Sequence, residues 1–361
     1  MKNFKIIFLY SLTFIALITA CISWLNNLNQ IAGWSLALFF LLLSIVCRTV
    51  SVLRGLSFTM IIFSVVTIAF IHPEYFISWN GFPLSSAIIP LIQLLMFGMG
   101  SSMGIRDFEA VIKSPKAVAI GVLCQFTIMP LLGMLLAFAT KLPAEIAAGI
   151  VLIGCSPSGL ASNVMSYLAK ANLALSVTVT SVTTLLAPLV TPLLMKLIAG
   201  AYIEINTLQM MWDIVKMILI PIGAGLLFNR LVKGKSKWLD DFMPFLSMFS
   251  IACIVLIISA AGANYLIKMG FVLIIAALIH NLFGYLLGYW VSRWFKLPER
   301  DCRTIAIEVG MQNAGLASGI AKQLGKVATV GLAAAVFGPV MNVTGSVLAS
   351  WWHNRNPGDK N

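Results

Sequence analysis

Glu308 is a carboxylate in the middle of an otherwise apolar stretch, Ile305 to Gly319, which reads IAIEVGMQNAGLASG. Two carboxamides, Gln312 and Asn313, follow it in the same stretch. A charged side chain at the centre of a bilayer costs about 2.5–3.5 kcal/mol even on insertion scales, so such residues usually face a cavity or a partner. If this stretch crosses a membrane, we expect Glu308 to line a cavity or to bind a cation.

A second polar segment, Gly154 to Asn163, reads GCSPSGLASN. Pro157 lacks an amide hydrogen and has glycines close to it on both sides, so a helix should break there and expose backbone carbonyls as ligands. Ser162 and Asn163 directly follow the predicted break.

Ser176 and Thr180 stand at positions i and i+4 of the next apolar stretch, and therefore on one face of one helix. A single hydroxyl in a membrane helix usually bonds its own backbone, so these residues matter as a group. One carboxylate among neutral oxygens suits a small hard cation, and sodium fits better than a transition metal. The neutral ligands are Ser162, Asn163, Ser176, Thr180, Gln312 and Asn313, with Gln125 as a further candidate. A proton relay through Glu308 is the alternative.

The composition places these groups in an integral membrane protein. Of the 361 residues, 60% are hydrophobic and 10% are charged, and the mean hydropathy is +0.98. Apolar stretches of about 20 residues recur along the whole chain. A spanning segment must satisfy its own backbone hydrogen bonds, and these stretches lack the alternation of barrel strands, so we predict an all-α fold.

About twelve transmembrane helices are predicted. Two lead the chain, Phe4–Trp24 and Ile31–Cys47; a cleaved signal sequence is the alternative for the first. Ten more are expected near 56–71, 84–103, 116–139, 145–169, 172–198, 210–229, 242–262, 269–294, 302–324 and 327–352.

Basic residues concentrate at alternate gaps between the predicted helices, which by the positive-inside rule places those gaps and both termini in the cytoplasm. The same distribution explains the net charge of +12 without a nucleic-acid partner. The residues of this group are Lys2, Lys5, Arg48, Arg54, Arg106, Lys113, Lys116, Lys170, Arg230, Lys233, Lys235, Lys237, Arg293, Lys296, Arg300, Arg303, Arg355 and Lys360.

The two polar segments share Gly-Leu-Ala-Ser, at 159–162 and at 315–318. They lie five predicted helices apart, and an odd offset means that the second copy runs through the membrane in the opposite direction. Inverted repeats with interrupted helices at matching places are typical of secondary transporters, whose site lies where the interruptions meet.

At these residues the chain resembles the bile acid:sodium symporter family. The motifs are MFGMG at 96–100, the segment 154–192 and EVGMQNAGLA at 308–317. The resemblance implies ten helices in two inverted five-helix repeats, with broken, crossing helices 4 and 9. The predicted division is an extra N-terminal hairpin over 1–55, repeats over 56–200 and 201–352, and a polar cytoplasmic tail over 353–361.

The resemblance also implies two sodium sites and a substrate cavity. The first site uses Ser162, Asn163, Ser176, Thr180 and Glu308. The second uses Gln125, Glu308 and Gln312 with the backbone carbonyls of Val309 and Met311. Asn313 is expected to face the substrate.

Two departures from the family pattern fall on the substrate wall. Leu160 stands where members commonly carry a threonine, and Val340-Met341-Asn342 stands where they commonly read Trp-His-Asn. Leu160, Met341 and Asn342 therefore join Asn313 as predicted cavity residues, and bile acid itself is in doubt as the substrate.

The function predicted from all of this is sodium-coupled import of an organic anion by alternating access, in the cell membrane, with no obligate protein partner. A proton-coupled carrier and a membrane receptor without net transport are the alternatives. An intramembrane enzyme should carry a catalytic pair such as two aspartates or HExxH, and the sequence has none.

Overall fold

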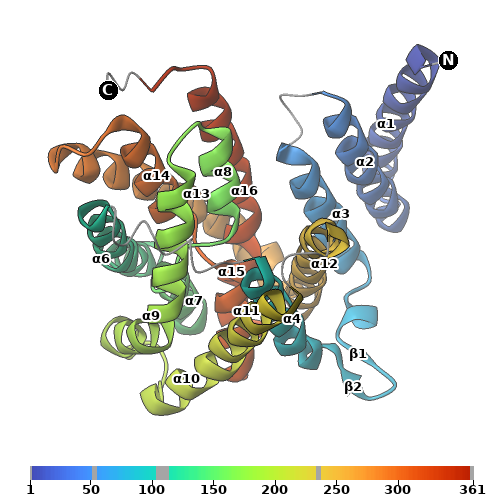
Figure 1. Cartoon of the computed structure of the whole chain (residues 1–361). Coiled ribbons are helices and arrows are strands. Elements are labelled where there is room, and N and C mark those ends of the chain that lie inside the picture. The colour runs from blue at the N-terminus through green and yellow to red at the C-terminus, as the bar shows by residue number, and fades with distance from the viewer. Residues whose placement is uncertain (1, 51–54, 103–113, 233–236, 358–361) are drawn as a thin grey trace.

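The computed structural model describes residues 2–50, 55–102, 114–232 and 237–357, and it is helical almost throughout (Figure 1). In this part of the chain eight helices are long and apolar enough to cross a membrane, and three shorter apolar helices accompany them. The chain is a multi-pass membrane protein. Of the basic residues used to predict topology, Arg54, Arg106, Lys113, Lys233, Lys235 and Lys360 lie outside the described residues, as does the end of the predicted tail.

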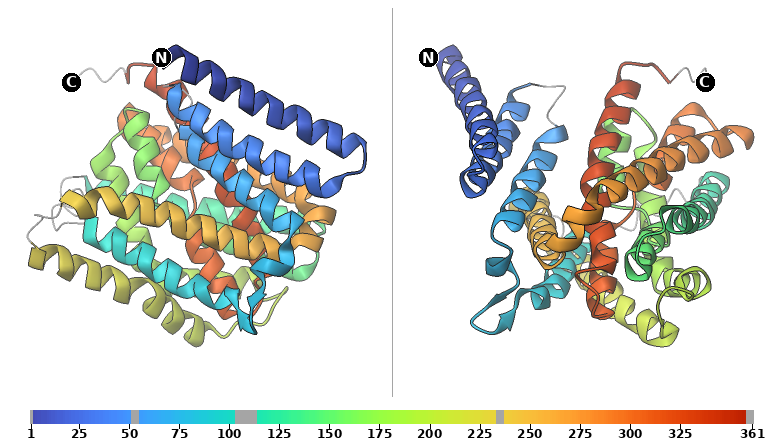
Figure 2. Two further views of the ribbon diagram at one scale, coloured as in Figure 1. Left: turned by 90° about the vertical axis from the view of Figure 1, so that its right-hand side faces the viewer. Right: turned by 180° about the vertical axis from the view of Figure 1, so that it is seen from behind.

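The N-terminal hairpin consists of α1 (Lys2–Leu25) and α2 (Asn29–Thr49), and α2 packs on α3 (Ser57–Ile71). The Arg48 guanidinium donates to the Ser57 hydroxyl at 3.0 Å, and that hydroxyl donates to the Ser44 carbonyl at 2.9 Å. Figure 2 shows the hairpin on the outside of the molecule, beside α3. It therefore extends one edge of the helical assembly.

A short irregular connection follows α3. The sequence predicted where the helices on either side of it end and begin, but no structure between them. It contains η2 (Pro73–Phe76), a two-stranded antiparallel sheet of β1 (Ser78–Trp79) and β2 (Phe82–Pro83), and η3 (Leu84–Ala87) before α4 (Ile88–Ser102). The turn is Asn80-Gly81, both with positive φ, which is the favoured chemistry for a two-residue hairpin loop.

The next helices are α6 (Pro115–Thr140), α7 (Ala144–Gly154), α8 (Ala161–Leu168) and α9 (Leu173–Ala199). They are followed by α10 (Thr207–Ile214), the π-helical turn η5 (Val215–Leu219) and α11 (Ile220–Val232), then by α12 (Lys237–Ala261). The chain ends with α13 (Ala263–Trp294), α14 (Glu299–Gly310), α15 (Ala314–Gln323) and α16 (Val330–His353).

The helices that follow the hairpin form two packed groups. In the first, which we call the panel group, α12 packs on α3 and on α4, and α4 packs on α11. In the second, the core group, α6–α9 pack with α13–α16. Figure 1 shows the panel group on the side of the N-terminal hairpin and the core group on the other side. The start of α1 and the end of α16 lie at the same end of the molecule (Figure 1).

Candidate functional site

The two interrupted helices contact each other at their interruptions. α7 ends at Gly154 and α8 begins at Ala161, so the break predicted around Pro157 is present; α14 ends at Gly310 and α15 begins at Ala314. Between these ends the two segments run antiparallel and pair at Ser158 and Gln312. The Gly159 amide donates to the Met311 carbonyl at 2.8 Å, and the Asn313 amide donates to the Pro157 carbonyl at 2.9 Å. Backbone groups that the helices leave unpaired thus satisfy one another.

The crossing leaves no room for a side chain at Gly159. A Cβ atom there would lie 2.6 Å from the Gln312 carbonyl oxygen and 3.1 Å from its carbon. Backbone atoms cannot rotate away as a flexible side chain can. Glycine at this position is therefore what allows the two interruptions to approach so closely.

Glu308 lies completely buried near the end of α14, directly before the crossing. Its carboxylate Oε1 accepts hydrogen bonds from Ser162 Oγ at 2.6 Å and from Ser176 Oγ at 2.5 Å. Its Oε2 accepts one from Thr180 Oγ1 at 2.7 Å. Asn163 Oδ1 lies 2.8 Å from Ser176 Oγ and 3.3 Å from Thr180 Oγ1. All five residues predicted for the first sodium site therefore form one cluster.

The hydroxyl groups of this cluster have fewer hydrogen atoms than they have oxygen atoms within hydrogen-bonding distance. The Ser162 hydroxyl has one hydrogen, yet it lies 2.7 Å from the Gly159 carbonyl, 2.6 Å from the Glu308 carboxylate and 3.3 Å from the Thr180 hydroxyl. Ser176 likewise has one hydrogen for two acceptor oxygens. A small cation accepts lone pairs from several such oxygens at once. The arrangement is chemically suited to binding one.

A second polar cluster surrounds Gln125 of α6, which is also fully buried. Its Nε2 donates to Gln312 Oε1 at 2.6 Å and to the Ser156 carbonyl at 2.8 Å. Gln312 Nε2 donates to the Val309 carbonyl at 2.6 Å. Three members predicted for the second sodium site thus lie together, while the Met311 carbonyl, a fourth, takes part in the crossing.

Ser158 connects the two clusters, and no role was predicted for it. Its hydroxyl donates to the Glu308 backbone carbonyl at 3.0 Å and lies 3.4 Å from Gln125 Oε1. Glu308 therefore contributes its carboxylate to the first cluster and its backbone carbonyl to the edge of the second. The only sequence signal for Ser158 was its position beside Pro157.

Asn281 of α13 was not among the predicted site residues. Asn281 is fully buried; its side-chain amide donates to the Gly310 carbonyl, and its Oδ1 accepts from the Thr344 hydroxyl. It thereby satisfies a carbonyl that the end of α14 leaves exposed. His280 contacts the Met129 carbonyl at 3.2 Å and stacks edge-on against Phe337, as a packing residue would.

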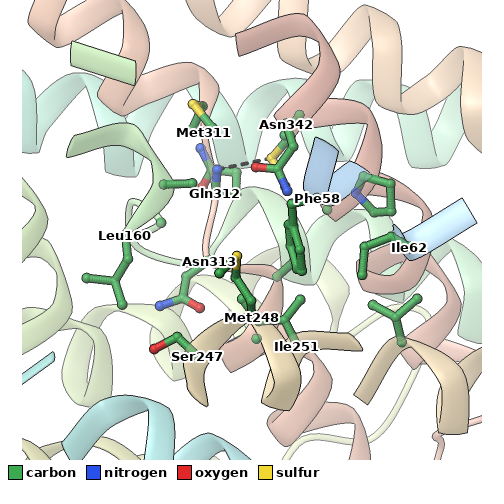
Figure 3. Close-up of a pocket in the computed structure, with 18 of the residues that line it drawn as sticks. Phe58, Ile62, Leu160, Ser247, Met248, Ile251, Met311, Gln312, Asn313 and Asn342 are labelled. Atoms are coloured by element: carbon green, nitrogen blue, oxygen red, sulfur yellow. Dashed lines mark hydrogen bonds between the residues drawn. The ribbon is translucent and has the colours of Figure 1, made fainter. Parts of the chain in front are cut away.

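A cavity of about 400 Å³ lies between the crossing and the panel group. All four predicted substrate residues, Leu160, Asn313, Met341 and Asn342, lie on its wall. Figure 3 shows Leu160 and Asn313 on one side of it and Phe58 and Ile62 across from them. The panel-group side is largely apolar, because α3 and α12 present mainly hydrophobic side chains together with the hydroxyls of Thr59 and Ser247. The hydrophobic side chains are Phe58, Ile62, Met248, Ile251, Ile254 and Val255. These panel residues were not predicted, since nothing local distinguishes them from other apolar residues.

Comparison with known proteins shows which family the chain resembles. The model of the sodium bile acid symporter family matches residues 89–269. An uncharacterized sodium-dependent transporter of Bacillus subtilis (strain 168), YocS, is 37% identical over 311 residues, which cover 86% of this chain and 95% of YocS.

Plant relatives match over a smaller share of their length. Probable sodium/metabolite cotransporters named BASS1, chloroplastic, are 34% identical over 270 residues in Oryza sativa subsp. japonica and 32% identical over 266 residues in Arabidopsis thaliana. In both comparisons 74% of this chain and 66% of the plant protein are covered. As its motifs predicted, the chain belongs to the sodium bile acid symporter family, a family of membrane transporters and not of enzymes.

Proposed function

We propose that this protein is a sodium-coupled symporter that imports an organic monoanion by alternating access, with the core group moving against the panel group. The observation that carries the proposal is the buried Glu308 carboxylate, held by three hydroxyls beside a cavity that the crossing helps to line. A lone buried carboxylate is costly unless a cation compensates it. The membership of a sodium symporter family supports sodium as that cation.

Two sodium ions are proposed. The first would bind among Ser162, Asn163, Ser176, Thr180 and Glu308, and the second among Gln125, Glu308, Gln312 and the carbonyls of Val309 and Met311. Bringing a monoanion into a cell with a negative interior costs about 2.3 kcal/mol per 100 mV, which one sodium ion merely cancels. A second ion lets the membrane potential drive uptake.

An inverted repeat would explain why the two breaks meet. A shift of 156 residues carries Gly154 to Gly310 and Ser162 to Ser318. The same shift carries α9 to 329–355, beside the observed α16 (Val330–His353), and it carries Gln125 to Asn281. The antiparallel pairing of Ser158 with Gln312 supports the opposite direction of the copies. The ten helices after the hairpin would then form two five-helix repeats, with both termini cytoplasmic.

The substrate is proposed to be an amphipathic monoanion. α8 and α15 both begin at the cavity, where Ala161, Ala314 and Gly315 line it. Helix N-termini favour negative charge, and half-helices that start at the midplane serve substrate carboxylates in other transporters. The apolar wall from α3 and α12 would hold the remainder of the molecule. Bile-acid-like, pantothenate-like and other carboxylates all satisfy this description.

Uptake into proteoliposomes tests the proposal. After a thermal-shift screen of organic anions with and without sodium, the anion most stabilising in sodium is expected to be taken up only with an inward sodium gradient. A negative interior should accelerate this uptake, because net positive charge enters. Replacing sodium with choline at constant pH should abolish it. Uptake that follows a proton gradient instead would favour the proton-coupled carrier, and ligand binding without counterflow of labelled ligand would favour a receptor.

Replacement of Asn342 tests the cavity. Asn342→Leu should raise the KM for the identified anion by about tenfold, because a substrate-facing hydrogen-bonding group worth about 1–1.5 kcal/mol is lost. The sodium-dependent thermal shift should remain, since no hydrogen bond among the described residues joins Asn342 to either polar cluster. Ile62→Val on the opposite wall is the matched control, with a change in KM of less than about threefold. An unchanged KM in Asn342→Leu would contradict the placement of the substrate.

A further inference from the structure

The interface between α9 and α14 carries polar residues beyond the Glu308 cluster. Asn172 caps the start of α9, and its side-chain amide donates to Asp301 Oδ1 of α14 at 2.8 Å. The Asn172 backbone amide donates to Thr304 Oγ1 at 2.9 Å, and the Thr304 hydroxyl lies 3.1 Å from the Asn172 carbonyl. Thr304 is one helical turn before Glu308, and Asn172 is one turn before Ser176.

These contacts form a continuous line, which we call the polar seam. On α14 its members are Asp301, Thr304 and Glu308, at i, i+3 and i+7 of one helix face; on α9 they are Asn172, Ser176 and Thr180, at i, i+4 and i+8. Each is joined to the facing helix by a hydrogen bond. The seam runs from the first polar cluster to the start of α14, where the neighbouring Lys170 and Arg300 are exposed.

The equivalent interface in the other half of the core group is apolar. A shift of 156 positions gives each seam residue an equivalent in the other half. Glu308 corresponds to Leu152 and Thr304 to Ala148. On the facing helix, Asn172, Ser176 and Thr180 correspond to Ala328, Leu332 and Val336. α7 packs on α16 there as α14 packs on α9, with Leu152, Ala148 and Leu332 fully buried. The same helix pairing thus forms with apolar residues, so folding does not require the polar ones.

Only the outermost position is acidic in both halves. Asp301 corresponds to Glu145, which is held by Lys326 and, at 2.5 Å, by the Thr329 hydroxyl. From Glu145 inward, the interface between α7 and α16 is apolar. From Asp301 inward to Glu308, the interface between α14 and α9 carries a row of oxygen atoms. Glu145 is therefore a matched control for the charge alone.

We propose that the polar seam is the passage along which sodium moves between the first polar cluster and the nearer aqueous face of the core group, with Asp301, Asn172 and Thr304 as transient ligands. The inference rests on the proposed sodium coupling. A sodium ion gives up most of its water to cross a protein interior, and carboxylate, carbonyl and hydroxyl oxygens in succession replace that water. Asp301 supplies the charge that offsets dehydration at the end of the passage.

A passage residue has a kinetic signature. It lowers a barrier, so its loss slows entry and exit of sodium by the same factor and leaves the equilibrium constant unchanged. A residue that merely supports the cluster would weaken equilibrium binding instead. We therefore expect Asp301→Asn, which keeps the shape of the side chain, and Thr304→Ala, which copies Ala148, to slow both rates at least about tenfold.

The experiment uses the full-length protein in inverted membrane vesicles, with sodium alone as the probe. Jumps in sodium concentration, upward and then downward, give the entry and exit rates from the charge movement, and sodium-dependent thermal shift of the purified protein gives the equilibrium. Glu145→Gln should change neither. The passage is supported if the seam variants slow sodium entry and sodium exit by the same factor, while the equilibrium constant for sodium binding stays within about twofold of wild type.

Two results would overturn it. Rates unchanged in both seam variants, while wild type responds to sodium, would refute the passage and leave the proposed function standing. Weakened equilibrium binding that accounts for the whole loss would make the seam a structural support.

A wild-type protein without any sodium response would refute the proposed function itself. A seam variant that fails to fold is replaced by Asn172→Ala, which copies Ala328.

Discussion

Glu308→Gln is expected to abolish sodium-driven uptake, with a loss of at least about a hundredfold, which corresponds to about 2.7 kcal/mol. The substitution removes the negative charge and turns one acceptor oxygen into a donor, in a cluster whose three hydroxyls already donate to it. Hydrogen bonds to charged groups contribute about 1.5–3 kcal/mol each, so the loss of the charged acceptor affects the whole shell. Uptake in proteoliposomes and sodium-dependent thermal shift measure the effect.

Two serines one helical turn apart on α8 provide a variant of the Glu308 cluster and its matched control. Ser162 and Ser166 are both buried on α8, but Ser162 contacts Glu308, whereas the Ser166 hydroxyl has no hydrogen-bond partner among the described residues. Ser162→Ala should weaken sodium binding about tenfold, and Ser166→Ala should leave it unchanged. Sodium-dependent uptake that survives in Glu308→Gln would contradict the assigned role of the carboxylate. Equal losses in the two serine variants would mean that packing of α8 is being measured.

Gly159→Ala should reduce uptake by about a hundredfold, the second of the two largest effects. The added Cβ would meet the Gln312 backbone carbonyl at 2.6 Å, so the two interruptions must separate. Forcing an extra carbon into a tight contact typically costs 1–3 kcal/mol, and here the displaced backbone also positions the Met311 carbonyl and Gln312. The sodium-dependent thermal shift should be lost together with uptake, because both proposed sodium sites adjoin the crossing.

Gly223→Ala is the matched control for this substitution. Gly223 lies within α11, and a Cβ there would meet nothing within 4 Å. The same chemical change should therefore preserve uptake, and the gain in helix propensity of about 1 kcal/mol should slightly stabilise the protein. If Gly159→Ala behaved like Gly223→Ala in both assays, the close approach of the two interruptions would have no role in transport.

Properties that depend on local covalent structure could be predicted from the sequence. A chain with this hydropathy must form helices in a membrane, because a spanning backbone has no other way to satisfy its hydrogen bonds. Pro157 removes an amide hydrogen wherever it stands, so the break of α7 and α8 was predictable. The placement of Ser176 and Thr180 on one face follows from the helical period alone. The resemblance to the family then assigned Gln125 to the second sodium site and added the backbone carbonyls of Val309 and Met311 as predictions.

Pairings between residues far apart in the chain required the tertiary structure. Ser158 joins Glu308 across 150 positions, and Asn172 joins Asp301 across 129. No local pattern distinguishes these residues from other polar residues at helix ends. The apolar wall of the cavity is a similar case, since Phe58 and Ile251 belong to separate helices that meet only in the fold.

The sequence by itself determined that this protein is a helical membrane protein with a carboxylate and two interrupted segments in its interior, because hydropathy, proline and glycine act on the chain locally. Only the tertiary structure decided which oxygen atoms surround Glu308 and how they continue to the start of α14. That choice depends on the packing of α9 on α14, and the same packing of α7 on α16 accommodates apolar residues. Helix geometry permits both interfaces, and the side chains that meet across each one set its chemistry.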